Sequence, residues 1–203
     1  MMKASILALV LALAACAPAP QTAKKKDPPK PPEPVGAQKA FFQMYAATRR
    51  WAPDANGFQM QSITTASMAQ TGGKFAGWRA IFVSPSRRAS RTYTFSAVED
   101  EGLSKGISQG QEESYSGPRG QNSDWPIQAL KIESDKALEA ALTKGKGAEF
   151  SKKNPTIPIT MQVEKIKKFG NPVYRVIWGA STSTSSFSVY VDASTGEYLE
   201  TVR

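Results

Sequence analysis

Two stretches of the chain place apolar residues at helical spacing. In residues 37–51 the apolar positions form one stripe, and Pro53 prevents the helix from continuing. Residues 135–144 form a second stripe, which Ser134 precedes as an N-cap residue and Gly145 closes. The apolar residues of the two stripes are Phe41, Phe42, Met44, Tyr45, Ala46, Ala137, Leu138, Ala141 and Leu142. We therefore predict two helices in the body of the protein.

The residues that follow each predicted helix alternate between apolar and polar positions, a pattern typical of half-buried strands. This pattern covers residues 58–68, 77–83, 91–98 and 103–112 after the first helix, and residues 157–164, 173–178 and 186–191 after the second. A helix followed by antiparallel strands can bury its apolar stripe against one face of a sheet. We predict an α+β fold of two tandem modules, each a helix packed on an antiparallel sheet.

Two strand segments of the first block resemble segments of the second. Residues 78–82, WRAIF, resemble residues 174–178, YRVIW, and residues 94–98 and 186–191 each precede an acidic turn that contains glycine. Such internal similarity is the signature of a duplicated unit. It predicts a first module over residues 37–115 and a second over residues 132–203, joined by a linker over residues 116–131 that is rich in Gly, Pro, Ser and Asn.

Residues 1–15 have the composition of an export signal. Lys3 supplies a positive charge, and the apolar run that follows is shorter than the roughly 20 residues that a membrane-spanning helix needs. The run leads into four residues that resemble the bacterial lipobox: Leu13, Ala14, Ala15 and Cys16. An ordinary signal peptide with a chance cysteine is the alternative interpretation.

The lipobox resemblance implies that a signal peptidase cleaves before Cys16 and that the thiol carries acyl chains. Two or three acyl chains hold a protein to a membrane durably, whereas one chain holds it only marginally. Ala17 stands where an aspartate would retain a lipoprotein in the inner membrane, so the resemblance implies the outer membrane, facing the periplasm. Residues 16–36 then form the lipidated cysteine and a Pro/Lys-rich tether, which we interpret as an extended spacer.

The composition excludes several kinds of active site. The chain contains no histidine, and its single cysteine is Cys16. Internal disulfides and Ser–His or Cys–His pairs are therefore impossible. Neighbouring carboxylates at residues 99–101 and 112–113 are typical of solvated positions rather than of general acid–base catalysis. We expect no enzymatic activity, no cofactor and no metal site.

The formal net charge of +9 suits anionic partners, although a soluble, self-repelling surface is the simpler interpretation. The most concentrated set of basic and aromatic residues gives five candidate partner-binding residues: Trp78, Arg79, Arg87, Arg88 and Arg91. Export to the envelope argues against nucleic acid as their ligand. The alternative is a solvated hairpin tip.

Residues 132–202 resemble a PepSY domain. Three segments carry the resemblance: residues 134–138, SDKAL, at a helix start; residues 173–176, VYRV, in a strand; and residues 189–197, VYVDASTGE, at a hairpin. PepSY domains are small helix-plus-sheet modules of protease propeptides and envelope proteins, so the resemblance implies two PepSY/cystatin-like modules without catalytic residues.

Together these features predict a non-catalytic, membrane-anchored envelope lipoprotein. Its partners would be membrane lipid, through acylated Cys16, and an envelope protein or cell-wall component. The alternative function is inhibition or regulation of an envelope protease.

Overall fold

The structure is a computed structural model that describes residues 31–202. The predicted export signal, the lipobox with Cys16 and most of the tether therefore lie outside the described residues. From Pro32 onward the chain forms one compact unit.

Three α-helices and nine strands make up the described part of the chain. The helices are α1 (Ala37–Thr48), α2 (Ser134–Thr143) and α3 (Gly147–Lys153), with a 3-10 turn at Ile127–Ala129. The strands are β1 (Asn56–Ile63), β2 (Gly77–Ser84), β3 (Ala89–Ser96), β4 (Gly106–Ser114), β5 (Asn122–Ser123), β6 (Ile159–Ile166), β7 (Val173–Trp178), β8 (Phe187–Asp192) and β9 (Tyr198–Val202). The predicted α+β class is confirmed.

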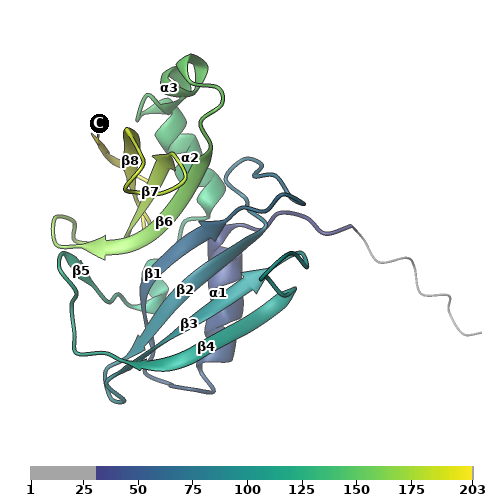
Figure 1. The fold of residues 1–203 in the computed structure, drawn as a ribbon. Helices are drawn as coiled ribbons and strands as arrows, with labels where there is room; N and C mark the ends of the chain where they lie inside the picture. Colours follow the sequence, from purple (N-terminus) through teal and green to yellow (C-terminus); the bar gives the residue numbers. More distant parts are fainter. Residues whose placement is uncertain (1–30, 203) are drawn as a thin grey trace, which may run out of the picture. The chain divides into compact units, whose positions relative to one another are not determined.

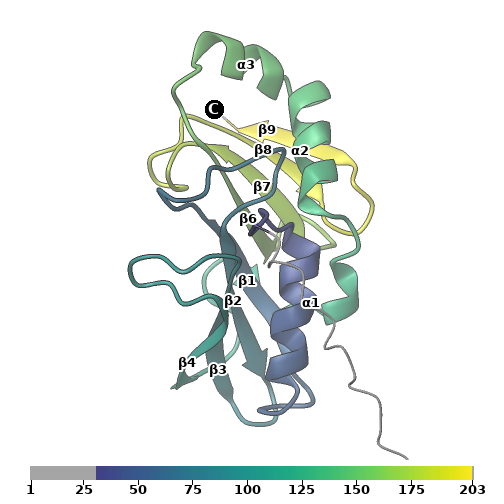
Figure 2. The ribbon, with the colours of Figure 1, turned by 90° about the vertical axis from the view of Figure 1, so that its right-hand side faces the viewer.

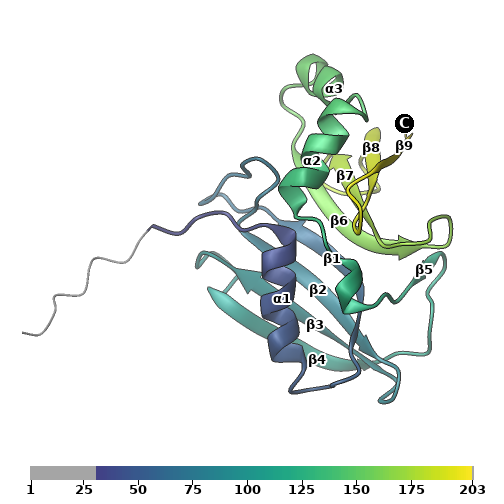
Figure 3. The ribbon, with the colours of Figure 1, turned by 180° about the vertical axis from the view of Figure 1, so that it is seen from behind.

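All nine strands belong to one antiparallel sheet, in the order β4-β3-β2-β1-β6-β7-β8-β9, with the short β5 paired to β6. Two four-stranded meanders thus meet where β1 pairs with β6, with Met60 opposite Val163 (Figure 1). Helix α1 covers the meander β1–β4, and α2 covers the meander β6–β9. Both helices lie on the same face of the sheet, which Figure 2 shows edge-on and Figure 3 shows from the helix side.

The core lies between the sheet and the helices. Its largest fully buried side chains include Trp78 on β2, Trp178 on β7 and Trp125 from the connection between the meanders. Trp125 stacks on Phe41 of α1, with ring centroids 4.9 Å apart. The predicted linker is therefore partly a core segment, because an indole ring gains more free energy from burial than exposed loop residues do.

The two main helices begin side by side and share one cap. The Glu133 carboxylate accepts hydrogen bonds from the backbone N–H groups of Gln38 and Lys39 in α1, at 2.9 and 3.2 Å. It also accepts one from the N–H of Ser134 in α2, at 2.9 Å. Glu133, rather than Ser134, is therefore the N-cap of α2. The Ser134 hydroxyl instead accepts a bond from the N–H of Ala37, at 2.9 Å.

The first apolar stripe is narrower than its sequence pattern suggests. Phe41 and Met44 are buried, but Phe42 is 41% exposed and Ala46 is also exposed. Helix α1 ends at Thr48 rather than at residue 51. Adjacent apolar residues in a helix point about 100° apart, so they cannot all face one sheet.

Candidate functional site

Trp78 and Arg79 are neighbours in β2 but point to opposite faces of the sheet, as strand geometry requires. Trp78 is fully buried, and its indole N–H donates to the Val35 carbonyl at 2.9 Å. Its ring therefore has no surface that a partner could contact. Arg79 is exposed on the face without helices, where it borders a hollow of about 80 Å³ with Gln59 and Gln61.

Arg87 and Arg91 gather around Glu112 of β4 and Trp51, which follows α1. The Glu112 carboxylate contacts Arg87 at 3.1 Å and Arg91 at 3.5 Å, and it accepts the indole N–H of Trp51 at 2.5 Å. Both guanidinium groups also lie over the Trp51 ring, 5.8 and 5.2 Å from its centroid. The hydrogen bond from Trp51 and the neighbouring arginines lower the pKa of Glu112. The two arginines thus share one carboxylate, which matches one of their two positive charges.

Arg88 lies in the β2–β3 turn and is exposed. Its φ of 52° places it in the left-handed region, which suits a tight turn rather than a strand. Of the five predicted residues, the structure therefore brings together Arg87, Arg88 and Arg91 at one hairpin. It places Trp78 in the core and Arg79 on the other face.

A hollow of about 420 Å³ lies between α1 and the edge of the sheet, next to this hairpin. One wall consists of Gln43, Ala46 and Ala47 of α1 and of Arg50 just after the helix, and the other wall consists of residues of β3 and β4. The lining residues are Gln43, Ala46, Ala47, Arg50, Tyr93, Ile107 and Gln109. We call this space the α1–β4 hollow. It exists because Ala46 and Ala47 have short side chains where the helix passes the edge strands.

Tyr93 of β3 lines the α1–β4 hollow and is only 1% exposed. Its ring packs edge-on against Phe82, with centroids 5.7 Å apart. The Tyr93 hydroxyl is buried and has no hydrogen-bond partner among residues 31–202. A buried polar group without a partner costs about 1–3 kcal/mol, so native proteins seldom keep one without a reason.

Strand β4 forms the open side of the hollow. It pairs only with β3, so one side of its backbone has no neighbouring strand within the described chain. Gln109 lies opposite Tyr93 and Ile107 lies opposite Phe95, so both side chains are on the helix side of the sheet. Ile107 is 43% exposed, an unusual position for an isoleucine.

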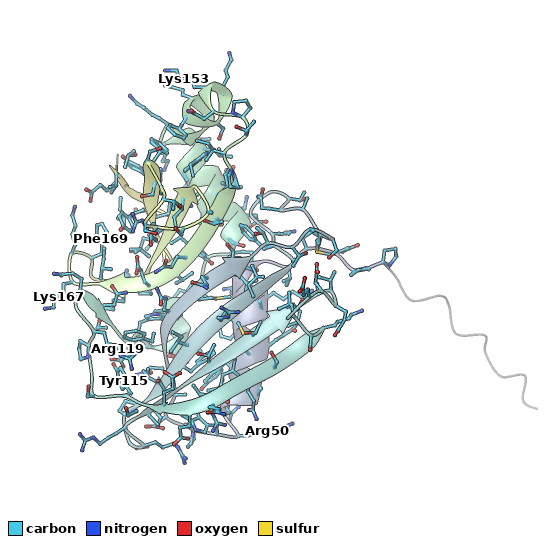
Figure 4. All side chains as sticks on the ribbon, viewed as in Figure 1. Arg50, Tyr115, Arg119, Lys153, Lys167 and Phe169 are labelled. Carbon is cyan, nitrogen blue, oxygen red and sulfur yellow. The ribbon has the colours of Figure 1, made fainter. Side chains whose placement is uncertain are left out.

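Arg50 is the only charged side chain among the residues that line the α1–β4 hollow. It is exposed and makes no ion pair with any residue that the structure describes. Figure 4 labels it at the lower end of the molecule, away from the second meander. The hollow can therefore offer hydrogen-bond donors and one positive charge to a ligand.

Sequence reasoning missed this hollow. The sequence pattern places Ala46 in the apolar stripe of the first helix, whereas the structure leaves it exposed. The available signal was the spacing of Gln43, Ala46, Ala47 and Arg50, which places two small residues between two polar ones on one face. That spacing alone does not show what faces it.

A second hollow, of about 320 Å³, lies beside α3. Phe150 of α3 and Phe187 of β8 stack there with centroids 4.5 Å apart, and Lys146 and Lys153 stand at its rim. Its polar lining atoms include no buried group without a hydrogen-bond partner among the described residues. It therefore gives less indication of a ligand than the α1–β4 hollow does.

Within the described residues, no group of three or more Asp, Glu, Cys or His side chains could hold a metal ion. None of the helices between residues 31 and 202 is long and apolar enough to cross a membrane.

Comparison of the chain with protein-family models, curated proteins and solved structures finds no match. The lipobox and PepSY resemblances therefore remain predictions from the sequence.

Proposed function

We propose that this protein is a non-catalytic lipoprotein of the bacterial envelope that holds a binding surface at the membrane. The lipobox-like residues Leu13, Ala14, Ala15 and Cys16 support the anchor. The α1–β4 hollow supports the binding role, because an open sheet edge beside a buried hydroxyl without a partner is an incomplete surface. The partner is an envelope protein or a cell-wall component.

We further propose that the body consists of two related PepSY/cystatin-like modules. In each meander, an aromatic side chain of the second strand donates a hydrogen bond to the backbone carbonyl of the residue two positions before the helix. The Trp78 indole reaches Val35 at 2.9 Å, and the Tyr174 hydroxyl reaches Ile132 at 2.7 Å. These two residues open the similar segments 78–82 and 174–178, so the contacts agree with the sequence similarity.

A second pair of contacts supports the same correspondence. The N–H of Ala97 donates to Ala76 at 2.8 Å, and the N–H of Ala193 donates to Pro172 at 2.9 Å. The same interval along the chain separates three pairs of residues: Ala76 and Pro172, Trp78 and Tyr174, and Ala97 and Ala193. At the centre of the sheet Gln61 faces Gln162, where a two-fold axis between the modules would pass.

The anchor is tested by metabolic labelling with a palmitate analogue. We expect label on the native protein and none on Cys16→Ser, since only the thiol can carry the diacylglycerol. Equal label on both proteins would overturn the anchor.

The binding role is tested by cross-linking in native membranes. A photoreactive amino acid at Gln109, in the α1–β4 hollow, is compared with one at Glu139, an exposed position on α2. We expect a discrete adduct with one envelope protein or with peptidoglycan from position 109 only. A protease in that adduct would favour the regulatory alternative, and identical products from both positions would contradict a binding surface at the hollow.

A further inference from the structure

We infer that the α1–β4 hollow binds an extended segment of a partner protein, which adds to β4 as a further antiparallel strand and places an acidic side chain in the hollow. This inference rests on the proposed binding role and deepens it by naming the ligand chemistry. Its two supports are the free edge of β4 and the donors that surround the hollow.

The backbone of β4 supplies the first support. The strand runs from Gly106 to Ser114 and is exposed along nearly its whole length, with β3 on one side only. Such an edge presents a row of N–H and C=O groups that can pair with an added strand. The same mode of recognition, strand addition beside a helix, is common in peptide-binding domains, where side-chain pockets give the specificity.

The side chains supply the second support. In a strand added beside β4, alternate side chains lie on the helix side of the sheet, where Ile107 and Gln109 already point. Among the residues that line the hollow, Arg50 carries a charge. Tyr93 has a buried hydroxyl without a hydrogen-bond partner among the described residues. A carboxylate accepts hydrogen bonds from both a phenol and a guanidinium group, whereas an ammonium group would be repelled by Arg50.

The open side of the hollow, along the edge of the sheet, favours an extended segment over a compact small ligand. Its volume of about 420 Å³ lies near the lower end of the range for small-molecule sites, and one of its sides is the open edge of the sheet. The Tyr93 hydroxyl is covered in the free protein. A rim side chain, such as the exposed Gln109, must turn aside before a ligand reaches it. An extended peptide supplies the backbone hydrogen bonds that offset this rearrangement.

Two other occupants are less suitable. The proline-rich residues 17–35 of this chain are poor strand formers, because proline lacks the N–H that a strand ladder needs. A second copy paired through β4 would bring four carboxylates, Glu112 and Glu113 of each chain, to one edge, where like charges on the paired strands repel each other.

The test uses the full chain in detergent and capped, fluorescein-labelled peptides of alternating threonine and valine with one central residue. We expect a peptide with central glutamate to bind at least tenfold more tightly than one with central lysine. Methylating the alternate N–H groups that face β4 should abolish binding, and methylating the other set should not. Equal binding of both methylated peptides would overturn strand addition.

Variants separate the contributions. Tyr93→Phe and Arg50→Gln should each weaken binding of the glutamate peptide about tenfold, and the matched control Tyr45→Phe should leave it unchanged. Free glutarate that competes as strongly as the peptide, or a protein that dimerises without binding peptide, would overturn the inference. If no peptide binds while position 109 still cross-links to a partner, this inference fails and the proposed binding role stands.

Discussion

In both meanders a helix packs on the same face of the sheet, but the hydrogen bonding of the hydroxyl groups between the helix and the edge strand differs. Beside α2 the hydroxyl groups near the edge strand are paired, although a hollow of about 340 Å³ also lies there: the Thr201 hydroxyl of β9 donates to the Gly145 carbonyl at 3.2 Å and lies 3.0 Å from the Tyr198 hydroxyl. Beside α1 the corresponding space is the α1–β4 hollow, and the Tyr93 hydroxyl within it has no partner among the described residues.

The size of the side chains explains the difference. At the end of α2, a side chain on Gly145 would lie 2.7 Å from Val189 of β8, so only glycine allows this close approach. In the first meander Tyr93 lies on β3, the strand next to the edge strand β4. Its aromatic ring packs against Phe82 beneath α1 and is larger than the Val189 side chain of the second meander. The comparison teaches that one architecture can pair the hydroxyl groups beside its edge strand or leave one of them, that of Tyr93, without a partner among the described residues.

The strongest test of the comparison removes the cap that both halves share. Glu133→Ala leaves three backbone N–H groups of α1 and α2 without their acceptor. We expect the free energy of unfolding to fall by about 2–3 kcal/mol, the sum of a lost cap on each helix. Urea denaturation measures it.

Glu139→Ala is the control for that variant, because Glu139 is exposed on α2 and pairs only with Lys136. It should change stability by less than about 0.5 kcal/mol. A Glu133 variant as stable as the Glu139 variant would show that the two helices do not depend on a common cap.

The next test makes one chemical change in each half. Tyr174→Phe removes the 2.7 Å hydrogen bond to the partly buried Ile132 carbonyl, so we expect a loss of about 1–2 kcal/mol. Tyr93→Phe removes a hydroxyl that has no partner, so stability should stay equal or rise by up to about 1 kcal/mol. Thermal and urea unfolding measure the stability of the two variants. Equal losses of stability would contradict the interpretation that the Tyr93 hydroxyl makes no hydrogen bond in the free protein.

The smallest effect concerns pH. The hydrogen bond from Trp51 and the arginines lower the folded pKa of Glu112 below its ordinary value of 4.5. The ionised carboxylate therefore stabilises the fold above that value, and this contribution disappears as the pH falls through the lower folded pKa. The difference in Tm between native protein and Glu112→Gln should shrink over this acid range. Glu113→Gln is the control for removing a carboxylate from this end of β4, because Glu113 makes no ion pair within the described chain.

Much of the fold could be predicted from the sequence. The spacing of Phe41 and Met44, and of Ala137 and Ala141, gives both main helices, and period-two alternation gives most strands. Helix α3 was not predicted, because residues 147–153 carry too few apolar positions to show a period. The α1–β4 hollow was not predicted: none of the five predicted partner-binding residues lines it, and Trp78 is a core residue.

The sequence by itself determined the α+β class, the local elements and the absence of histidine and of any cysteine beyond Cys16, because periodicity and composition are properties of neighbouring residues. Only the tertiary structure decided that β1 pairs with β6 to make one sheet, that Glu133 caps two helices, and that Tyr93 lies buried without a partner. The physical reason is that backbone groups are alike at every residue. Which distant strands or donors meet is therefore decided by how side chains pack together, not by any local pattern.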